Sequence, residues 1–305
     1  MRVDTFEVHE PVPELRDVCV IAILRPWLNA GRVGIQTLNR LKRHLDAKEL
    51  ARLPRPGNYY DFTRYRPRTR VIDGRRVLDI PNTIAHHARD NETGRDFILM
   101  DIREPHSNGE AYTDGVVALL KHFDVTEYCR VGAMYNSMPH TRPLIVTGNL
   151  SEERQKAVGN LVSPQRGGTY QGPTSMINVV TDELTEAGVT TTSLMAHLPQ
   201  HLPLGSDYKG TARLIEVLSA MYGFPADLAD FERADRQYQE LMDSSEANTP
   251  EMRSLTQELE MLYDRRQDTE QSQESQEAEE TEFSDDMTRF LNEMGQRLDD
   301  ERENE

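Results

Sequence analysis

Val18-Cys-Val-Ile-Ala-Ile-Leu24 is the longest uninterrupted apolar run in the sequence. It is rich in β-branched residues and shows no polar alternation, which is typical of a strand buried on both faces of a parallel sheet. Its seven residues are far fewer than the roughly 20 that a membrane-spanning helix needs. The run therefore predicts a central strand of a soluble α/β fold.

Helical and strand-like segments alternate after that run. The further strands are expected at 97–102, 128–134, 144–147 and 189–197, and the helices at 32–45, 110–123, 151–158, 173–187 and 208–222. Such alternation predicts right-handed βαβ units around a mostly parallel sheet with helices on both faces. We therefore expect an α/β core domain over residues 1–225, with a three-layer α/β/α architecture.

The segment between the first helix and the second strand has a different pattern. Residues 53–80 are rich in Pro, Arg and Tyr, with short extended pieces at Arg70–Ile72 and Val77–Ile80 on either side of Gly74. This pattern predicts an antiparallel excursion from the main sheet. We interpret Pro81–Arg89 as a short helix.

After Pro225 the pattern becomes purely helical. The spacing 3, 4, 3 between apolar residues occurs twice, first at Phe231, Ala234, Tyr238 and Leu241, and then at Met252, Leu255, Leu259 and Leu262. Two helices with such seams predict a helical hairpin over residues 226–266. The hairpin packs either on its own body or on another subunit.

The negative charge of the chain lies mainly at its C-terminal end. The whole chain has 52 acidic and 35 basic side chains and a net charge of −17. Residues 267–305 hold 15 acidic and 3 basic side chains, a net −12, which leaves −5 for residues 1–266. We expect a disordered acidic linker at 267–282. An amphipathic tail helix is expected at 283–305, where apolar residues recur at helical spacing, and it docks on a protein surface or stays without a partner.

Charge and motifs exclude several functional classes. A net charge of −17 argues against binding to nucleic acid or to an anionic membrane, since both require clustered Lys and Arg. The sequence has no P-loop, no dinucleotide-binding glycine motif, no nucleophile elbow and no His-Glu-x-x-His. Cys19 and Cys129 are predicted to be buried reduced thiols, which fits a cytoplasmic location. We expect no catalytic residue, no cofactor and no metal.

Ligands of open α/β sheets usually bind where parallel strands end. The most unusual loop of this kind is Met138-Pro-His-Thr-Arg-Pro143. There His140 can act as an acid or base, and Arg142 can pair with a carboxylate or phosphate. Alternatively, the two prolines rigidify a turn whose His and Arg bond to carbonyls or a carboxylate. His197 and His201 are four apart, but Pro199 interrupts the helical spacing that a metal site would need.

Five loop motifs, taken in order, resemble the proteasome assembly chaperone family in its bacterial, actinobacterial-type branch. The resemblance covers about residues 10–265. The residues that carry it are Trp27, Asn29 and Gly31, then Glu104 and Pro105, then Pro139, His140, Thr141, Arg142 and Pro143, then Tyr170, Gly172 and Pro173, and finally Pro199 within His197-Leu-Pro-Gln-His-Leu202. We interpret them as interface or ligand positions.

The resemblance implies a fold similar to nucleoside phosphorylases and self-association, often as homotrimers. It also implies that archaeal and eukaryotic relatives are assembly chaperones of the proteasome core, while no reaction is established for bacterial members. The sequence departs from the family at Asn29, where Asp is frequent. It also ends in Glu303-Asn-Glu305, without the hydrophobic-Tyr-x tail of relatives that bind the proteasome.

Taken together, these features favour a non-enzymatic protein-interaction or assembly-chaperone-like protein. Its expected partners are further copies of itself and subunits of a proteasome or another ring protein. The alternative is a small-molecule enzyme or a nucleoside- or anion-binding protein that uses the crevice near His140 and Arg142. An open cavity beside these two side chains would favour the alternative.

Overall fold

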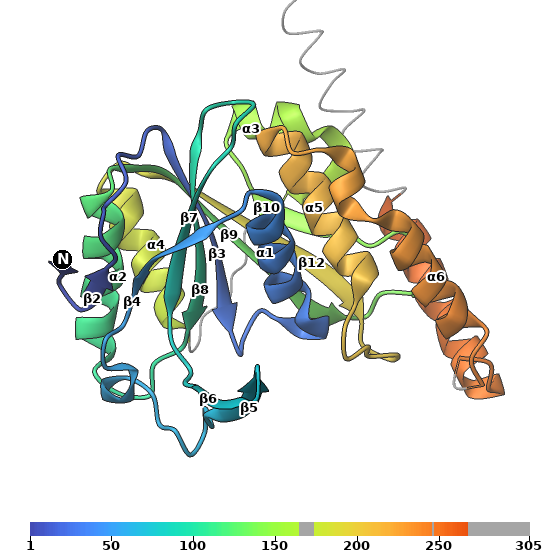
Figure 1. The fold of residues 1–305 in the computed structure, drawn as a ribbon. Coiled ribbons are helices and arrows are strands. Elements are labelled where there is room, and N and C mark those ends of the chain that lie inside the picture. Colours follow the sequence, from blue (N-terminus) through green and yellow to red (C-terminus); the bar gives the residue numbers. More distant parts are fainter. Residues whose placement is uncertain (165–173, 246, 268–305) are drawn as a thin grey trace, which may run out of the picture. The chain divides into compact units, whose positions relative to one another are not determined.

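A ten-stranded sheet forms the centre of the molecule in the computed structural model, which describes residues 1–164, 174–245 and 247–267 (Figure 1). Its middle consists of β8 (Asp96–Arg103), β3 (Val18–Arg25), β9 (Val125–Asn136) and β12 (Thr190–Pro199). These four neighbours are all parallel to one another. The apolar run that begins at Val18 is therefore the central strand that its composition predicts.

Mainly antiparallel strands extend the sheet on both sides of this parallel centre. Next to β8 lie β7 (Ile84–Arg89), β4 (Lys48–Arg52), β2 (Phe6–Val8) and β1 (Arg2–Val3), each antiparallel to its neighbour. Next to β12 lies β10 (Val146–Asn149), which is antiparallel to it, followed by β11 (Ser163–Pro164), which is parallel to β10. The sheet is thus mixed, with the predicted parallel arrangement confined to its middle.

The prediction of a short helix at Pro81–Arg89 is wrong. Residues Ile84–Arg89 form strand β7, in which Ala85 pairs with Ala51 of β4 and with Met100 of β8. Two neighbouring strands satisfy the backbone N–H and C=O groups of this segment, so pairing in the sheet overrides the helix propensity of its alanines. The sequence analysis also assigns no strand to Lys48–Arg52, the other partner of β7.

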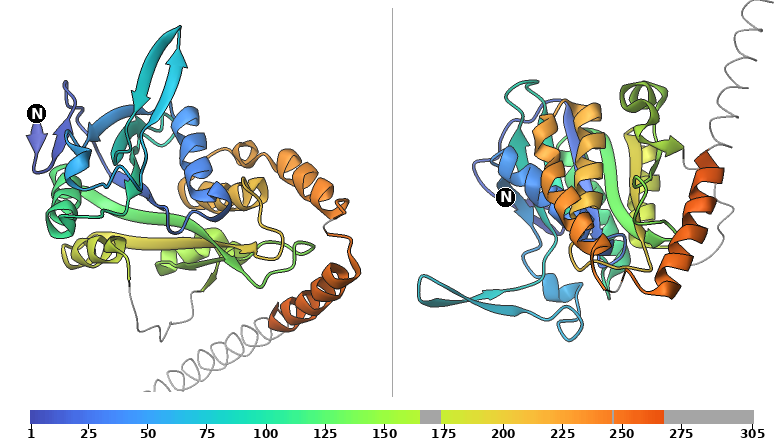
Figure 2. Two further views of the ribbon diagram at one scale, coloured as in Figure 1. Left: turned by 90° about the horizontal axis from the view of Figure 1, so that it is seen from below. Right: turned by 90° about the vertical axis from the view of Figure 1, so that its right-hand side faces the viewer.

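Helices cover both faces of the sheet and give the expected three-layer α/β/α fold (Figure 2). One face carries α1 (Val33–His44), α3 (Glu152–Val158) and α5 (Tyr208–Tyr222). The opposite face carries α2 (Gly109–His122) and α4 (Met176–Glu186). The Ser151 side chain caps α3 by accepting a hydrogen bond from the Arg154 N–H at 3.3 Å.

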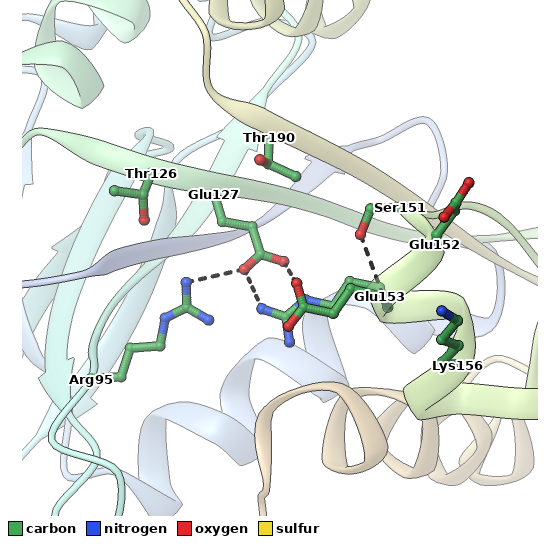
Figure 3. Close-up of a pocket in the computed structure, with 9 residues that line it drawn as sticks. Arg95, Thr126, Glu127, Ser151, Glu152, Glu153, Lys156 and Thr190 are labelled. Atoms are coloured by element: carbon green, nitrogen blue, oxygen red, sulfur yellow. Dashed lines mark hydrogen bonds and ion pairs between the residues drawn. The ribbon is translucent and has the colours of Figure 1, made fainter. Parts of the chain in front are cut away.

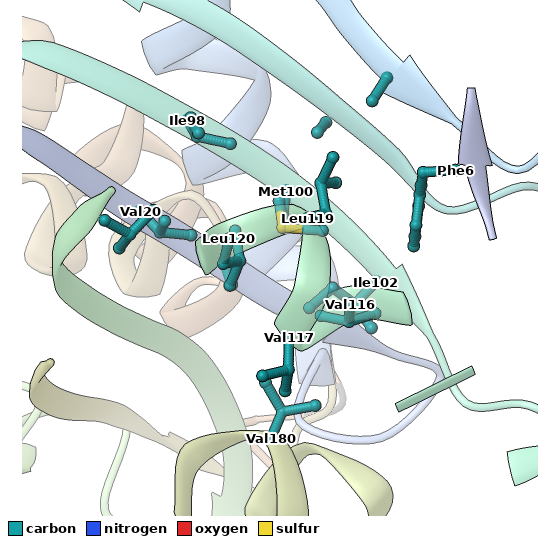
Figure 4. Close-up of a cluster of buried hydrophobic side chains, with 14 of the residues drawn as sticks. Phe6, Val20, Ile98, Met100, Ile102, Val116, Val117, Leu119, Leu120 and Val180 are labelled. Atoms are coloured by element: carbon teal, nitrogen blue, oxygen red, sulfur yellow. The ribbon is translucent and has the colours of Figure 1, made fainter. Parts of the chain in front are cut away.

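The alternation of side chains along the strands produces two separate hydrophobic cores. Val20 of β3 packs with the core on the α2 side, whereas Ile21 belongs to the core on the α1 side. Figure 4 shows part of the first core, with Val20 beside Leu120 of α2 and Ile102 of β8 beside Val116. The α1-side core also contains the free thiols of Cys19 and Cys129, and burial raises the pKa of both, that of Cys129 to about 12.

A two-stranded antiparallel ribbon projects from the body. It consists of β5 (Arg68–Ile72) and β6 (Arg75–Asp79), which pair with each other and not with the main sheet (Figure 2). We refer to residues 68–79 as the arm. The arm is the antiparallel excursion that the sequence predicts, and all residues of both of its strands are exposed.

Two helices follow α5. The first is α6 (Phe231–Met242), which packs on α5 through Ala212, Ile215 and Ala234. The chain divides into compact units at 1–248 and 249–305, and the described part of the second unit contains a helix over 250–267. Apart from Gln267, the predicted linker and tail helix lie outside the described residues. The division into domains stays a prediction. None of the described helices is long and apolar enough to cross a membrane.

Candidate functional site

The described family-motif residues follow neighbouring strands at one edge of the sheet. Strands β3, β8 and β9 end at Arg25, Arg103 and Asn136, and β12 ends at Pro199. Because these strands are parallel, the loops that follow them meet at their carboxyl ends. The motif residues at this edge are Trp27, Asn29, Gly31, Glu104, Pro105, Pro139, His140, Thr141, Arg142, Pro143 and Pro199. Tyr170, Gly172 and Pro173 lie outside the described residues.

Asn29 and Gly31 hold the first of these loops in place. The Asn29 Oδ1 accepts a hydrogen bond from the N–H of Ile35, at 3.1 Å, in the first turn of α1. Gly31 has φ +53°, and its carbonyl accepts from the N–H of Asp207 at 2.8 Å. A Cβ on Gly31 would lie 2.7 Å from the Asp207 Cβ. Both motif residues therefore join the loop to its neighbours, and the approach at Gly31 requires glycine.

Trp27 differs from Asn29 and Gly31 because its side chain is exposed to solvent. It is the only tryptophan of the chain, and 62% of its surface is exposed. It lines two pockets at this edge, one on the side of β9 and β12 and the other on the side of β8. An exposed indole between two pockets is suited to contact a ligand or a partner protein.

The loop after β9 does not present His140 to solvent. His140 is only 4% exposed, and its Nδ1 lies 3.1 Å from the Nε2 of His201. Burial and the neighbouring His140 lower the pKa of His201, which favours its neutral imidazole. Neither His140 nor Arg142 lines either of the two pockets that contain Trp27.

The first of these pockets, which we call the Arg130 pocket, has a volume of about 560 Å³. It lies over β9, β12 and β10, beside the start of α4. Its polar lining residues are Arg130, Thr147, Thr174, Ser175, Asn178, Ser193 and His197, and its other lining residues are Trp27, Leu28, Met134, Pro164 and Met195.

Arg130 reaches this pocket because β9 directs alternate side chains to the face covered by α2 and α4. Arg130 pairs in register with Ser193 of β12. Its Nε and Nη2 donate to the Ser193 Oγ at 3.4 and 3.3 Å, and its Nη1 donates to the Asn178 Oδ1 of α4. The sequence analysis missed Arg130, although a lone Arg within an otherwise apolar strand was a signal for it.

His197 is the second ionisable residue of the Arg130 pocket. Its Nε2 lies 2.9 Å from the Thr147 Oγ1, and its Nδ1 lies 3.1 Å from the Asn136 Nδ2. An amide Nδ2 can only donate, so this contact makes Nδ1 the acceptor and leaves the proton of a neutral ring on Nε2. Polar contacts on both sides thus fix the imidazole within the pocket wall.

The second pocket, which we call the Glu104 pocket, has a volume of about 770 Å³ and lies next to the base of the arm. Its lining residues are Pro26, Trp27, Gly57, Tyr60, Asp61, Arg64, Tyr65, Glu104, Pro105, His106 and Ser107. The Glu104 Oε1 accepts from the N–H of Met176 at 3.0 Å, which joins the end of β8 to the start of α4. Burial raises the pKa of Glu104.

A third pocket, of about 640 Å³, lies at the opposite, amino ends of β9 and β12 (Figure 3). There the Glu127 carboxylate accepts from the Nη2 and Nε of Arg154 at 2.6 and 3.1 Å, and it lies 3.1 Å from the Nη2 of Arg95. The Tyr222 hydroxyl also donates to Glu127, at 2.9 Å. Asp17 also lies 3.2 Å from the Nε of Arg95, so Glu127 and Asp17 together balance the two arginines, and we interpret the cluster as structural.

No group of three or more His, Cys, Asp or Glu residues suited to hold a metal ion occurs within residues 1–164, 174–245 and 247–267. The ionisable groups that line the two pockets at the carboxyl edge include the guanidiniums of Arg64 and Arg130, the carboxylates of Asp61 and Glu104, and the imidazoles of His106 and His197. Such an arrangement can bind polar groups.

The sequence from residue 23 to residue 245 matches the model of the PAC2 family. The chain belongs to the PAC2 family. The resemblance to proteasome assembly chaperones is therefore confirmed at the level of the family. No curated protein matches this PAC2 protein.

Solved structures share the fold of this PAC2 protein. A Corynebacterium glutamicum protein of unknown function has a TM-score of 0.74 at 22% identity, over 85% of this chain and 97% of its own. A Mycobacterium tuberculosis proteasome-assembly chaperone homologue has a TM-score of 0.66 at 24% identity, over 78% and 99%. Pyrococcus furiosus PbaB, an archaeal proteasome activator, has a TM-score of 0.60 at 16% identity, over 78% and 96%. At these identities the likeness shows the fold alone.

Proposed function

We propose that this PAC2 protein is a non-enzymatic, assembly-chaperone-like protein that binds the subunits of a ring-forming complex. Membership of the family supports the proposal. So do the structural relatives described as a proteasome-assembly chaperone homologue and as a proteasome activator. We expect it to act in the cytoplasm, where buried free thiols such as Cys19 and Cys129 stay reduced.

The arm is the observation that carries this proposal. Val71, Ile72, Val77 and Leu78 are all exposed, Val71 by 73% and Leu78 by 54%. An isolated two-stranded hairpin is only marginally stable in water. Exposed apolar side chains gathered on one projecting element are typical of a protein-binding site. The arm is therefore suited to be covered by a partner.

The charges of the arm indicate the chemistry of that partner. The arm carries four Arg and two Asp, whereas the whole chain has a net charge of −17. Its register places Arg70 opposite Val77 and Arg76 opposite Val71, so each face of the ribbon presents both Arg and apolar side chains. The fitting partner is a protein surface with apolar side chains bordered by carboxylates.

The alternative of an enzyme that acts through His140 draws no support from this geometry, since His140 is buried against His201. Self-association, with the trimer implied by the resemblance, stays a prediction. Sedimentation equilibrium of the purified chain measures it directly, and a monomer at all concentrations would contradict it.

Affinity purification from the native host tests the arm. The variant Val71→Thr/Leu78→Thr removes apolar surface from the arm, and Val179→Thr, at an exposed apolar position of α4, is the matched control. We expect the wild type and the control to retain subunits of a proteasome or another ring protein, and the arm variant to lose them. Retention of the same subunits by the arm variant would overturn the assignment. So would a loss of self-association alone, because the arm would then bind a second copy.

A further inference from the structure

Arg130 has no carboxylate partner among the residues that the structure describes. Its guanidinium donates only to the hydroxyl of Ser193 and the amide oxygen of Asn178. Three other partly buried arginines are paired with acids: Arg25 with Asp101, Arg95 with Glu127, and Arg154 with Glu127. A half-buried guanidinium whose hydrogen-bond acceptors are all neutral favours an incoming anion.

The lining of the Arg130 pocket supports the same inference. None of the twelve described lining residues is Asp or Glu. The contrast with the third pocket is direct, because there the carboxylate of Glu127 already pairs with both Arg95 and Arg154. Hydroxyl and amide groups beside Arg130 add hydrogen-bonding capacity without adding negative charge.

Four other lining residues of the pocket are apolar, namely Trp27, Leu28, Met134 and Met195. A volume of about 560 Å³ lies within the range of about 300–1,000 Å³ that is usual for small-molecule sites. A cation together with aromatic and thioether side chains suits a ligand with a charged head and a flat apolar body.

We propose that the Arg130 pocket binds a small organic anion whose phosphate or carboxylate head is bound by Arg130 and whose apolar body lies against Trp27. This site is separate from the arm, so the inference does not depend on the proposed function. The two ligand classes, nucleoside monophosphates and aromatic carboxylates, share the anionic head and the flat body.

The fluorescence of Trp27 tests the proposal, because the chain has no other tryptophan. The full-length protein is titrated at constant ionic strength with adenosine monophosphate and with phenylacetate, and inorganic phosphate serves as a competitor. Adenosine and phenylacetamide are the matched neutral probes. We expect saturable quenching by one of the two anions and at least about tenfold weaker binding of its neutral analogue, equivalent to about 1.4 kcal/mol.

Variants locate the site. Arg130→Gln should weaken binding of the anion at least tenfold, and Arg130→Lys, which keeps the charge but loses the forked geometry, should weaken it less. Arg64→Gln, in the Glu104 pocket that Trp27 also lines, is the matched control and should bind as the wild type does. If Arg130→Gln has a lower melting temperature than the wild type, the affinity of Arg130→Lys for the anion is compared with that of Arg64→Gln instead. Weaker binding by Arg130→Lys than by Arg64→Gln then supports the proposal. Absence of saturable quenching by both anions would overturn the proposal, as would equal affinity in the Arg130 and Arg64 variants.

Discussion

Replacing Glu127 with Ala tests how strongly the ion-pair cluster at the amino ends of the strands stabilises the fold. The Glu127 side chain is only 5% exposed, and both of its oxygens are occupied. The substitution removes the hydrogen bonds from Arg154 and from the Tyr222 hydroxyl and the ion pair with Arg95 (Figure 3). It leaves two cations close together without their shared counter-charge.

The magnitude follows from how much compensation the arginines retain. Breaking a buried ion pair by removing one partner costs about 3–5 kcal/mol. Arg154 keeps a 2.6 Å hydrogen bond to the Met221 carbonyl, and Arg95 keeps one of 3.1 Å to the Asp17 carbonyl. Both arginine side chains also have some contact with water, with 16% and 20% of their surface exposed. We therefore expect Glu127→Ala to lower the free energy of unfolding by about 3 kcal/mol, the low end of that range, and the Tm by roughly 6–12 °C.

Thermal and urea unfolding followed by circular dichroism measure this loss. Glu153→Ala is the matched control, because Glu153 is an exposed carboxylate that lines the same pocket. Its loss should cost less than about 1 kcal/mol, the usual magnitude of a charge in the first turn of a helix. In Glu127→Ala/Arg154→Ala the two effects should be clearly less than additive. A Glu127→Ala protein as stable as Glu153→Ala would refute a stabilising role for the cluster.

Three further predictions concern other parts of the chain. Burial lowers the pKa of His86 from its usual 6.5 to about 4, so the unfolded chain takes up the proton at a higher pH than the folded chain does. The free energy of unfolding should therefore fall as the pH decreases from 6.5 toward 4, and a His86→Gln variant should show a shallower dependence of Tm on pH. A Cβ at Gly132 would lie 2.7 Å from the Leu28 carbonyl oxygen, so Gly132→Ala should lower the free energy of unfolding by about 1–3 kcal/mol and shift the fluorescence emission of Trp27. Unchanged melting and emission would contradict the close approach. Deletion of residues 267–305 should change the Tm by no more than a few degrees if the segment buries little surface, and a large decrease would show that it packs on the body.

The centre of the fold could be predicted because local signals and tertiary pairing agree there. The bounds of α5 match the prediction, since Asp207 caps its start through the N–H of Gly210 and Gly223 ends it. Strand β7 could not be predicted in the same way. Its sequence suits a helix, and only pairing with β4 and β8 makes it a strand.

The candidate site was predictable as an edge but not as a set of side chains. The rule that parallel strands end together identified the loops after Leu24, Ile102 and Met134. His140 and Arg130 show why this rule did not identify the individual side chains of the site. The conspicuous loop residue His140 is buried, whereas the strand residue Arg130 becomes a candidate only when the described fold shows that it donates to Ser193 and Asn178 and to no carboxylate.

The two ends of the sheet bear on how copies of this PAC2 protein can assemble. Within the residues that the structure describes, the sheet terminates in β1 at one side and β11 at the other, each with two residues. Such short edges offer few unpaired backbone groups, which disfavours the joining of sheets from neighbouring copies into a continuous ribbon. Open-ended polymerisation through the backbone is thereby disfavoured. Assembly through the main sheet is instead favoured through side-chain surfaces, whose specific geometry permits a closed assembly of fixed size.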